Sequence, residues 1–442
     1  MNIQLSDHFG YTKLLRFTLP SIAMMVFTSI YGVVDGLFVS NFVGKSEFAA
    51  VNFIFPFLMI LGTVGFMLGT GGSALIAKTM GEGDKERANS LFSLFIYVAL
   101  ALGVIIAVLS FIFIRPIAML MGAEGEMLGH CVTYARILIL SLPALILQFM
   151  FHSFFVTAEK PQLGLYVTVG AGVANMVLDA LLTAVFPLGI VGAAVATAMS
   201  QVIGGFVPLI YFARKNSSLL RLTKTKFYGK ALLKASANGS SELMSNVSMS
   251  LVSMLYNIQL INYAGENGVA AYGVLMYVNF VFVSMFIGFA VGSAPVFSFH
   301  FGAANTGELK SLLKKSTAIN VTASFIMALA AFILAVPLSK VFVGYDAELY
   351  EMTVAGFRIS AFSYLFSGLA IFGSSFFTAL NNGLISATIS FLRTLVFQVG
   401  AVLILPIILG IDGIWLSIVV AEFIAAAVSV AFIMVMRRKY KY

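Results

Sequence analysis

The chain has 442 residues, of which 60% are hydrophobic and 10% are charged, and its formal net charge is +8. A soluble domain carries about 25% charged residues, so this chain cannot cover itself with a polar surface and must lie largely in lipid. The single cysteine, Cys131, excludes an internal disulfide and a cysteine-based metal cluster. No glycine-rich phosphate loop, histidine–cysteine metal spacing or nucleophile elbow is present, which argues against an enzyme.

Apolar windows long enough to cross the hydrocarbon core, about 20 residues each, recur along the whole chain. Backbone groups in hydrocarbon must bond within their own segment, so each window is predicted to be a helix. We predict an all-α integral membrane protein with twelve transmembrane helices, at residues 15–40, 51–77, 90–114, 130–156, 163–186, 189–213, 235–263, 269–300, 316–339, 352–379, 384–409 and 412–436.

Lysine and arginine are concentrated in every second loop of this arrangement, and such an excess marks the cytoplasmic side of a membrane protein. With the N-terminus in the cytoplasm, 20 of the 26 basic residues lie on that side, and only Lys45, Arg115 and Lys340 lie on the outer side. We therefore predict that both termini are cytoplasmic. The same distribution explains the positive net charge without a nucleic-acid partner.

The stretch RKNSSLLRLTKTKFYGKALLK, at 214–234, has seven basic residues and no acidic residue. It is interpreted as a cytoplasmic linker, with binding to anionic lipid as the alternative. The predicted domains are an N-terminal six-helix lobe at 1–213, this linker, and a C-terminal six-helix lobe at 235–442.

The two halves share landmarks at an offset of 221 or 222 residues, which include Gly44 with Gly265, Pro116 with Pro337, and Arg136 with Arg358. An ordered series of this kind indicates duplication of a six-helix unit. Because six is even, both copies enter the membrane the same way round, which predicts two six-helix bundles related by a parallel internal repeat. Such pairs bind substrate at their interface and alternate access by rocking, so the repeat favours a transporter.

Charges inside the predicted helices are few and are candidates for function. Asp35 and Asp179 lie in the outer halves of the first and fifth helices, and Asn175 lies one turn before Asp179 on the same helix face. Thr197, on the inward-running sixth helix, reaches the same depth. Two carboxylates, an amide and a hydroxyl form a site for a proton or a small hard cation such as Na⁺. The alternative for each aspartate is a helix-end side chain that reaches the outer interface.

The repeat gives an internal control for this site. Asn175 corresponds to Val396 and Asp179 to Gly400, so the acidic site occurs only in the N-terminal half. Paired carboxylates in low dielectric tend to share one proton. Pro20 is a kink point in the first helix.

The seventh helix has polar residues at roughly helical spacing. This face is predicted to line an aqueous cavity, with hydrogen bonding between helices as the alternative. Arg393 and Glu422, in neighbouring helices, are interpreted as a charge-neutralising pair, with a substrate contact by Arg393 as the alternative. His152 is expected to form an interhelical hydrogen bond, with a proton relay as the alternative. The substrate-cavity candidates are Asn238, Glu242, Ser245, Tyr256, Asn257 and Arg393.

The stretches VDGLFVSNFVG at 34–44 and GTGGSALIAKTMGEGDKERA at 69–88 resemble the multidrug and toxic compound extrusion (MATE) family, and the likeness covers essentially the whole chain. The resemblance implies a cation-coupled exporter in the bacterial cytoplasmic membrane. It also implies that Asp35, Asn175, Asp179 and Thr197 match the N-lobe cation site of the DinF/MepA-like branch, and that the first helix bends at Pro20. Ser250 occupies the position of the helix-seven glutamate found in the other major bacterial branch.

We therefore predict a multidrug exporter that exchanges H⁺ or Na⁺ for small amphipathic, cationic compounds by alternating access. It is expected to act as a monomer in the lipid bilayer, without a cofactor and without nucleic acid. The alternative is a flippase of the same superfamily for lipid-linked or polysaccharide substrates. A flippase would need a basic cavity for anionic headgroups, and only Arg393 lies deep in the helices. The sequence leaves the substrate range and the coupling ion open.

Overall fold

The computed structural model describes residues 3–442, in which fourteen α-helices and three π-helical segments make up the fold and no strand occurs. The α-helices are α1 (Tyr11–Phe38), α2 (Lys45–Gly81), α3 (Lys85–Leu120), α4 (Gly125–Leu140), α5 (Leu142–Thr157), α6 (Pro161–Asp179), α7 (Gly189–Ala213), α8 (Gly229–Gly302), α9 (Thr306–Val343), α10 (Ala347–Ala361), α11 (Tyr364–Ala379), α12 (Gly383–Phe391), α13 (Gln398–Leu409) and α14 (Ile411–Tyr440). The π-helical segments are η1 (Val39–Val43), η2 (Ala180–Val185) and η3 (Leu392–Phe397).

Twelve membrane crossings can be traced through the described residues. Nine helices are individually long and apolar enough to cross a bilayer, and the bent pairs α4–α5 and α10–α11 raise the total to eleven. The 74-residue helix α8 contains two crossings, because its backbone leaves helical geometry at Gly265, where φ is 61° and ψ is −151°. The predicted all-α membrane fold is therefore confirmed.

The helix boundaries differ from the prediction at several places. The predicted helices 130–156 and 352–379 are each broken in the middle, by bends of 59° and 50°. Pro143 in the first turn of α5 explains the first bend, because proline starts a helix readily but cannot continue one. Residues 229–234, expected in the linker, already belong to α8.

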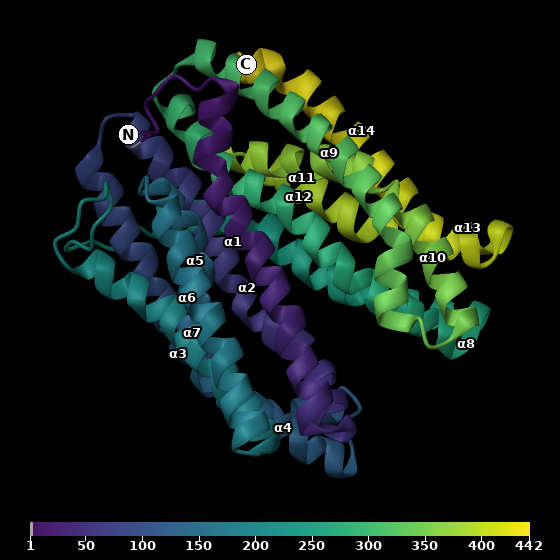
Figure 1. Cartoon of the computed structure of the whole chain (residues 1–442). Helices are drawn as coiled ribbons and strands as arrows, with labels where there is room; N and C mark the ends of the chain where they lie inside the picture. Colours follow the sequence, from purple (N-terminus) through teal and green to yellow (C-terminus); the bar gives the residue numbers. More distant parts are fainter. Residues whose placement is uncertain (1–2) are drawn as a thin grey trace.

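Two helical bundles diverge from one end of the molecule, as Figure 1 shows. Helices α1–α7 form the first bundle, and α8–α14 form the second. Both chain termini lie at the end where the bundles meet (Figure 1). We call this end the terminal face; it also carries the α2–α3 turn, the α8–α9 turn and the segment 214–228. We call the opposite end the far face.

The internal repeat appears in local geometry as well as in sequence. The guanidinium carbon of Arg136 lies 5.3 Å from the ring centre of Phe111, and Arg358 stands at the same distance from Phe332. A cation held over an aromatic ring in this way stabilises the contact between α3 and α4, and between their equivalents α9 and α10. The repeated arginines therefore anchor helices in both bundles.

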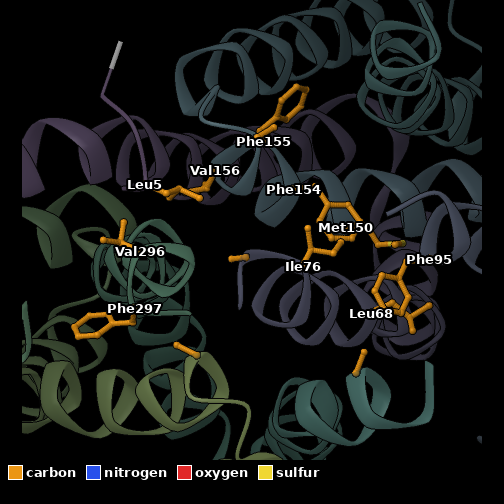
Figure 2. Packing of buried hydrophobic residues seen from close by; sticks show 14 of the residues in the cluster. Leu5, Leu68, Ile76, Phe95, Met150, Phe154, Phe155, Val156, Val296 and Phe297 are labelled. Atoms are coloured by element: carbon orange, nitrogen blue, oxygen red, sulfur yellow. The ribbon is translucent and has the colours of Figure 1, made fainter. Parts of the chain in front are cut away.

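The bundles touch most closely near the terminal face. Helices α2 and α8 cross there, and a methyl group on Gly81 would overlap the carbonyl oxygen of Phe299, while one on Gly302 would overlap that of Lys78. Glycine allows this close backbone approach. Figure 2 shows part of the large core cluster beside this crossing, including Leu68 of the first bundle and Val296 and Phe297 of the second.

Candidate functional site

The four residues predicted to form a cation site meet inside the first bundle. Asp35 lies in the far-face half of α1, and Asp179 is the last residue of α6. The Asp35 carboxylate lies within reach of the side chains of Asp179, Thr197 and Asn175. The Thr197 hydroxyl, on α7, is 3.4 Å from Asp35 Oδ1 and also donates to the carbonyl oxygen of Ala193 at 3.1 Å.

Several buried polar atoms of this cluster lack hydrogen-bond partners in the described structure. Asp179 is 0% exposed and Asn175 is 1% exposed. Among the residues described, neither carboxylate oxygen of Asp179 nor the amide nitrogen of Asn175 has a partner of hydrogen-bond geometry. The contact between Asp35 and Asp179 becomes a hydrogen bond only when one carboxyl group holds a proton.

The donor set of this cluster limits what it can bind. Ion pairs within residues 3–442 include no basic side chain on Asp35 or Asp179. Leaving two adjacent carboxylates ionised in low dielectric is costly, so a proton or a monovalent cation would stabilise the pair. No group of three or more His, Cys, Asp or Glu side chains in the described part of the chain is arranged to hold a metal ion.

Each cluster of charges adjoins a π-helical segment. Segment η1 begins four residues after Asp35, η2 begins directly after Asp179, and η3 contains Arg393. A π-helical turn inserts an extra residue into the helix and changes the direction of the neighbouring side chains, and such turns occur frequently at functional sites. Pro20 lies inside the continuous helix α1, where its missing N–H removes one helical hydrogen bond.

A cavity of about 280 Å³ lies between the bundles, mainly on the side of the second bundle. Its charged side chains are Glu242, Arg393 and Glu422. Serine and threonine hydroxyls and aromatic rings form most of the remaining wall. Of the described residues in the first bundle, Phe66, Thr70, Ser73 and Ser153 line the cavity.

Four of the six predicted cavity residues line this space: Glu242, Ser245, Tyr256 and Arg393. The hydroxyl of Tyr256 donates to Gln398 Oε1 at 3.0 Å, and its ring stacks on that of Tyr272 with centres 5.1 Å apart.

The other two predicted residues, Asn238 and Asn257, lie outside the cavity lining. Asn238 is buried nearer the terminal face, where its amide nitrogen donates to the carbonyl oxygen of Thr378 at 2.8 Å. At this level Gly383 packs directly on the backbone of Asn238, so the helices leave no space for a cavity.

The charged residues of the cavity form two unequal groups. Arg393 Nε donates to both carboxylate oxygens of Glu422 at 3.0 Å, and its Nη2 lies 2.8 Å from Oε1. The predicted pairing of Arg393 with Glu422 is therefore present. Glu242 has no hydrogen-bond or ion-pair partner for its carboxylate among residues 3–442. The three groups together leave one negative charge facing the cavity when all are ionised.

Two residues near these sites have surroundings that the sequence did not predict. Tyr134, on α4, is fully buried, and its hydroxyl lies beside Thr197. A single tyrosine in an apolar helix is typical of packing, so its position gave no signal. His152 was expected to form a hydrogen bond, but both ring nitrogens lack a partner in the described structure. It is instead buried against the rings of Phe66 and Phe149.

Comparison with known proteins gives one matching family. The family model MatE matches residues 20–181 and, a second time, residues 243–404. The chain is 25% identical to the multidrug export protein MepA of Staphylococcus saprophyticus over 429 residues, 97% of this chain and 94% of that protein. It is 24% identical to MepA of Staphylococcus haemolyticus over 430 residues, again 97% of this chain and 94% of the relative.

Solved structures show the same fold. An outward-facing structure of a multidrug resistance MATE family transporter of the MOP superfamily matches with a TM-score of 0.93 at 24% identity, over 100% of this chain and 98% of that one. A MOP superfamily transporter from Pyrococcus furiosus matches with a TM-score of 0.91 at 24% identity, over 98% of each chain.

Proposed function

Because this chain belongs to the MatE family of membrane transporters, we propose that it is a multidrug exporter that exchanges H⁺ or Na⁺ for amphipathic organic cations by alternating access. The observation that carries this proposal is the pair of adjacent carboxylates in one bundle, partly buried Asp35 and fully buried Asp179, without a basic partner within the described residues. The full-length relatives named as multidrug export proteins support it.

The Asp35–Asp179 pair acts as the coupling site. When the pair is ionised, it takes up a proton or Na⁺ from the far face, and Asn175 and Thr197 supply neutral oxygens. Binding removes the net charge from the cluster and lowers the cost of enclosing it in hydrocarbon. One monovalent cation that crosses about 100 mV supplies about 2.3 kcal/mol, and a tenfold concentration gradient adds about 1.4 kcal/mol.

The cavity in the second bundle holds the substrate. An unpaired carboxylate at Glu242, beside the neutralised Arg393–Glu422 pair, favours an organic cation. Aromatic and hydroxyl side chains accept varied apolar and polar groups. A flippase for anionic headgroups would need an excess of positive charge here, so the cavity supports the exporter over this second function.

The same proposal includes the orientation and the moving parts. Both termini lie in the cytoplasm of a bacterial cell, and the far face opens to the outside. The lobes 1–213 and 229–442 rock about the linker 214–228, with Pro20 as the point at which α1 bends. The protein acts as a monomer.

The proposal is tested by removing each carboxylate charge in turn. We expect Asp35→Asn and Asp179→Asn to reach the membrane and bind ethidium, a fluorescent organic cation, but to lose efflux driven by a proton or sodium gradient. The measurements are ethidium binding to purified protein and efflux from proteoliposomes with each gradient imposed separately. Asp412→Asn, the same chemical change at an exposed residue in the first turn of α14, is the control. Normal coupled efflux in the Asp35→Asn variant would refute the coupling site.

A further inference from the structure

The segment before α1, residues 3–10, lies across the terminal face between the two bundles, and we call it the N-terminal strap. Two of its side chains, Leu5 and Phe9, are 0% exposed. Figure 2 shows Leu5 with Val156 of the first bundle and Val296 of the second, all in one core cluster. An eight-residue segment of this kind is therefore part of the packing between the bundles.

Carboxylates on both bundles hold the backbone of the strap. The Leu5 N–H donates to Glu159 Oε1 at 2.6 Å, and Glu159 lies between α5 and α6 of the first bundle. The Phe9 N–H donates to Glu308 Oε1 at 2.9 Å, and Glu308 is in the first turn of α9 of the second bundle. The strap therefore joins the two bundles through charge-assisted hydrogen bonds.

Further contacts tie the strap to the second bundle and to α1. His8 Nδ1 lies 2.6 Å from Glu308 Oε2, and the Lys315 ammonium donates to the carbonyl oxygen of Phe9. Within the N-terminal segment, the Lys13 ammonium hydrogen-bonds to Asp7 at 2.8 Å and lowers the pKa of the Asp7 carboxyl. These contacts fix the path of the strap from the first bundle to α9.

The internal repeat shows that the two carboxylates are not general features of the fold. Glu159 has a φ of 59°, and its repeat equivalent, Asn381, has a φ of 56°. Asparagine tolerates this left-handed conformation better than glutamate does. The equivalent of Glu308 in the first copy is Arg87, at the same distance from the helix cap. An unfavourable glutamate at 159 is explained by its bond to the strap.

The linker makes the reciprocal connection on the same face. The Arg221 N–H donates to Asn89 Oδ1 and the Thr223 N–H donates to Ser93 Oγ, both at 2.8 Å. Asn89 and Ser93 lie on α3, which is the repeat equivalent of α9. The segment that precedes the first helix of each bundle therefore binds the third membrane crossing of the opposite bundle, which is α9 in the second bundle and α3 in the first.

We propose that the N-terminal strap is a latch that holds the terminal face closed and must release each time that face opens. The linker is covalently continuous with both bundles and stays attached when they separate. The strap reaches the second bundle only through non-covalent contacts, so separation of Glu159 from Glu308 breaks them. The latch rests on the alternating access of the proposed function.

The first test measures how often the strap lifts. A reporter cysteine replaces Val296, which is 0% exposed in the core cluster that contains Leu5, in a Cys131→Ala background. In detergent-purified protein, we expect Glu308→Ala and Glu159→Ala to raise the rate of maleimide labelling about tenfold, as removal of a charged hydrogen bond predicts. Glu86→Ala, at an exposed position in the first turn of α3, should leave the rate unchanged. Equal rates in all three variants would refute the latch.

The second test locks the strap in place. His8→Cys with Glu308→Cys, joined by a short reducible bis-methanethiosulfonate linker, ties the strap to the second bundle. We expect ethidium efflux to stop when the link forms and to return when it is reduced. Asp7→Cys with Lys13→Cys, treated in the same way, links two groups 2.8 Å apart within the N-terminal segment and should not stop efflux.

The tests separate the latch from the proposed function. Continued efflux after complete cross-linking between residues 8 and 308 would refute the latch while leaving the exporter intact. If the unlinked protein moves no ethidium under any gradient, the proposed function fails, and the labelling rates still decide whether the strap opens.

Discussion

Asp179 and Glu422 are both buried acidic side chains, but their carboxylates have different neighbours. Glu422 is neutralised by Arg393 at 2.8 Å, whereas Asp179 has another carboxylate, Asp35, as its neighbour. A neutralised pair can stay permanently inside the helices, while two adjacent carboxylates need a mobile cation. The difference separates a neutralised pair from the pair that we propose as the coupling site.

Residue types and helical spacing were sufficient to predict that Asp35, Asn175, Asp179 and Thr197 meet. Helix direction sets the depth of each side chain in the membrane, and a four-residue spacing sets the face. The same reasoning could not separate Asn238 from Glu242, one turn apart on α8. The helices close around Asn238 and part around Glu242, which depends on packing between distant segments.

Glu242→Gln tests the charge of the cavity. Removing this carboxylate should weaken binding of ethidium about tenfold, as the Coulomb interaction of two charges several ångströms apart in a protein interior predicts. A neutral substrate of similar size should bind with unchanged affinity. Ser245→Ala, one turn along the same cavity wall, is the control. Equal weakening of the neutral and the cationic compound would show that Glu242 supports the fold rather than recognises charge.

Glu422→Ala tests the ion pair. It leaves the Arg393 guanidinium, whose side chain is 17% exposed, without its partner, which should destabilise the protein by about 2 kcal/mol. The double variant Arg393→Met with Glu422→Leu removes both charges and should recover most of that loss. The measurement is the midpoint of thermal unfolding in detergent for the single and double variants. A double variant no more stable than the single one would contradict the interpretation as a neutralising pair.

At the scale of helices, apolar length predicted where the chain crosses the membrane but not where a crossing bends. The bend between α4 and α5 coincides with Pro143, a signal that was present in the sequence. The bend between α10 and α11, at Phe362 and Ser363, has no proline. Both helices pack on α8, α9 and α14, and no residue at the bend signals it, so local sequence did not predict it.

Gly81 and Gly302 test the crossing of α2 with α8. A methyl group at either position would meet a backbone carbonyl of the other helix, so Gly81→Ala and Gly302→Ala should each cost about 1–3 kcal/mol from overpacking. Gly273→Ala is the matched control on α8, because open space surrounds Gly273 and alanine favours a helix by up to about 1 kcal/mol. The midpoint of thermal unfolding in detergent ranks the stability of the three variants. Equal midpoints for all three variants would show that α2 and α8 can move apart to accept the methyl group without loss of stability.

On the scale of the whole molecule, duplication explains most of the architecture. A six-helix unit present twice in parallel brings the start of both copies to one face, and Figure 1 shows the bundles meeting there. The family model MatE matches the chain twice, at 20–181 and 243–404, as expected if the two halves arose by duplication. The copies then differ in their polar side chains: the carboxylate pair lies in the first bundle and most of the cavity in the second. If the proposed coupling site is correct, the effect of cation binding in one bundle has to reach the cavity in the other.

The direction of transport depends on which face is cytoplasmic, and single cysteines in a Cys131→Ala background test it. The terminal face carries most of the lysine and arginine, and basic loops are retained in the cytoplasm. Cysteine at Ser217, an exposed residue of the linker, should therefore react with a membrane-impermeant maleimide only after intact bacterial cells are permeabilised. Cysteine at Tyr345, which is 84% exposed between α9 and α10 on the far face, should react without permeabilisation. The opposite labelling pattern would show that the protein is inserted with its terminal face outside the cell. The Asp35–Asp179 pair, which lies toward the far face, would then meet the cytoplasm, and an inward-directed proton or sodium gradient could not load it from outside.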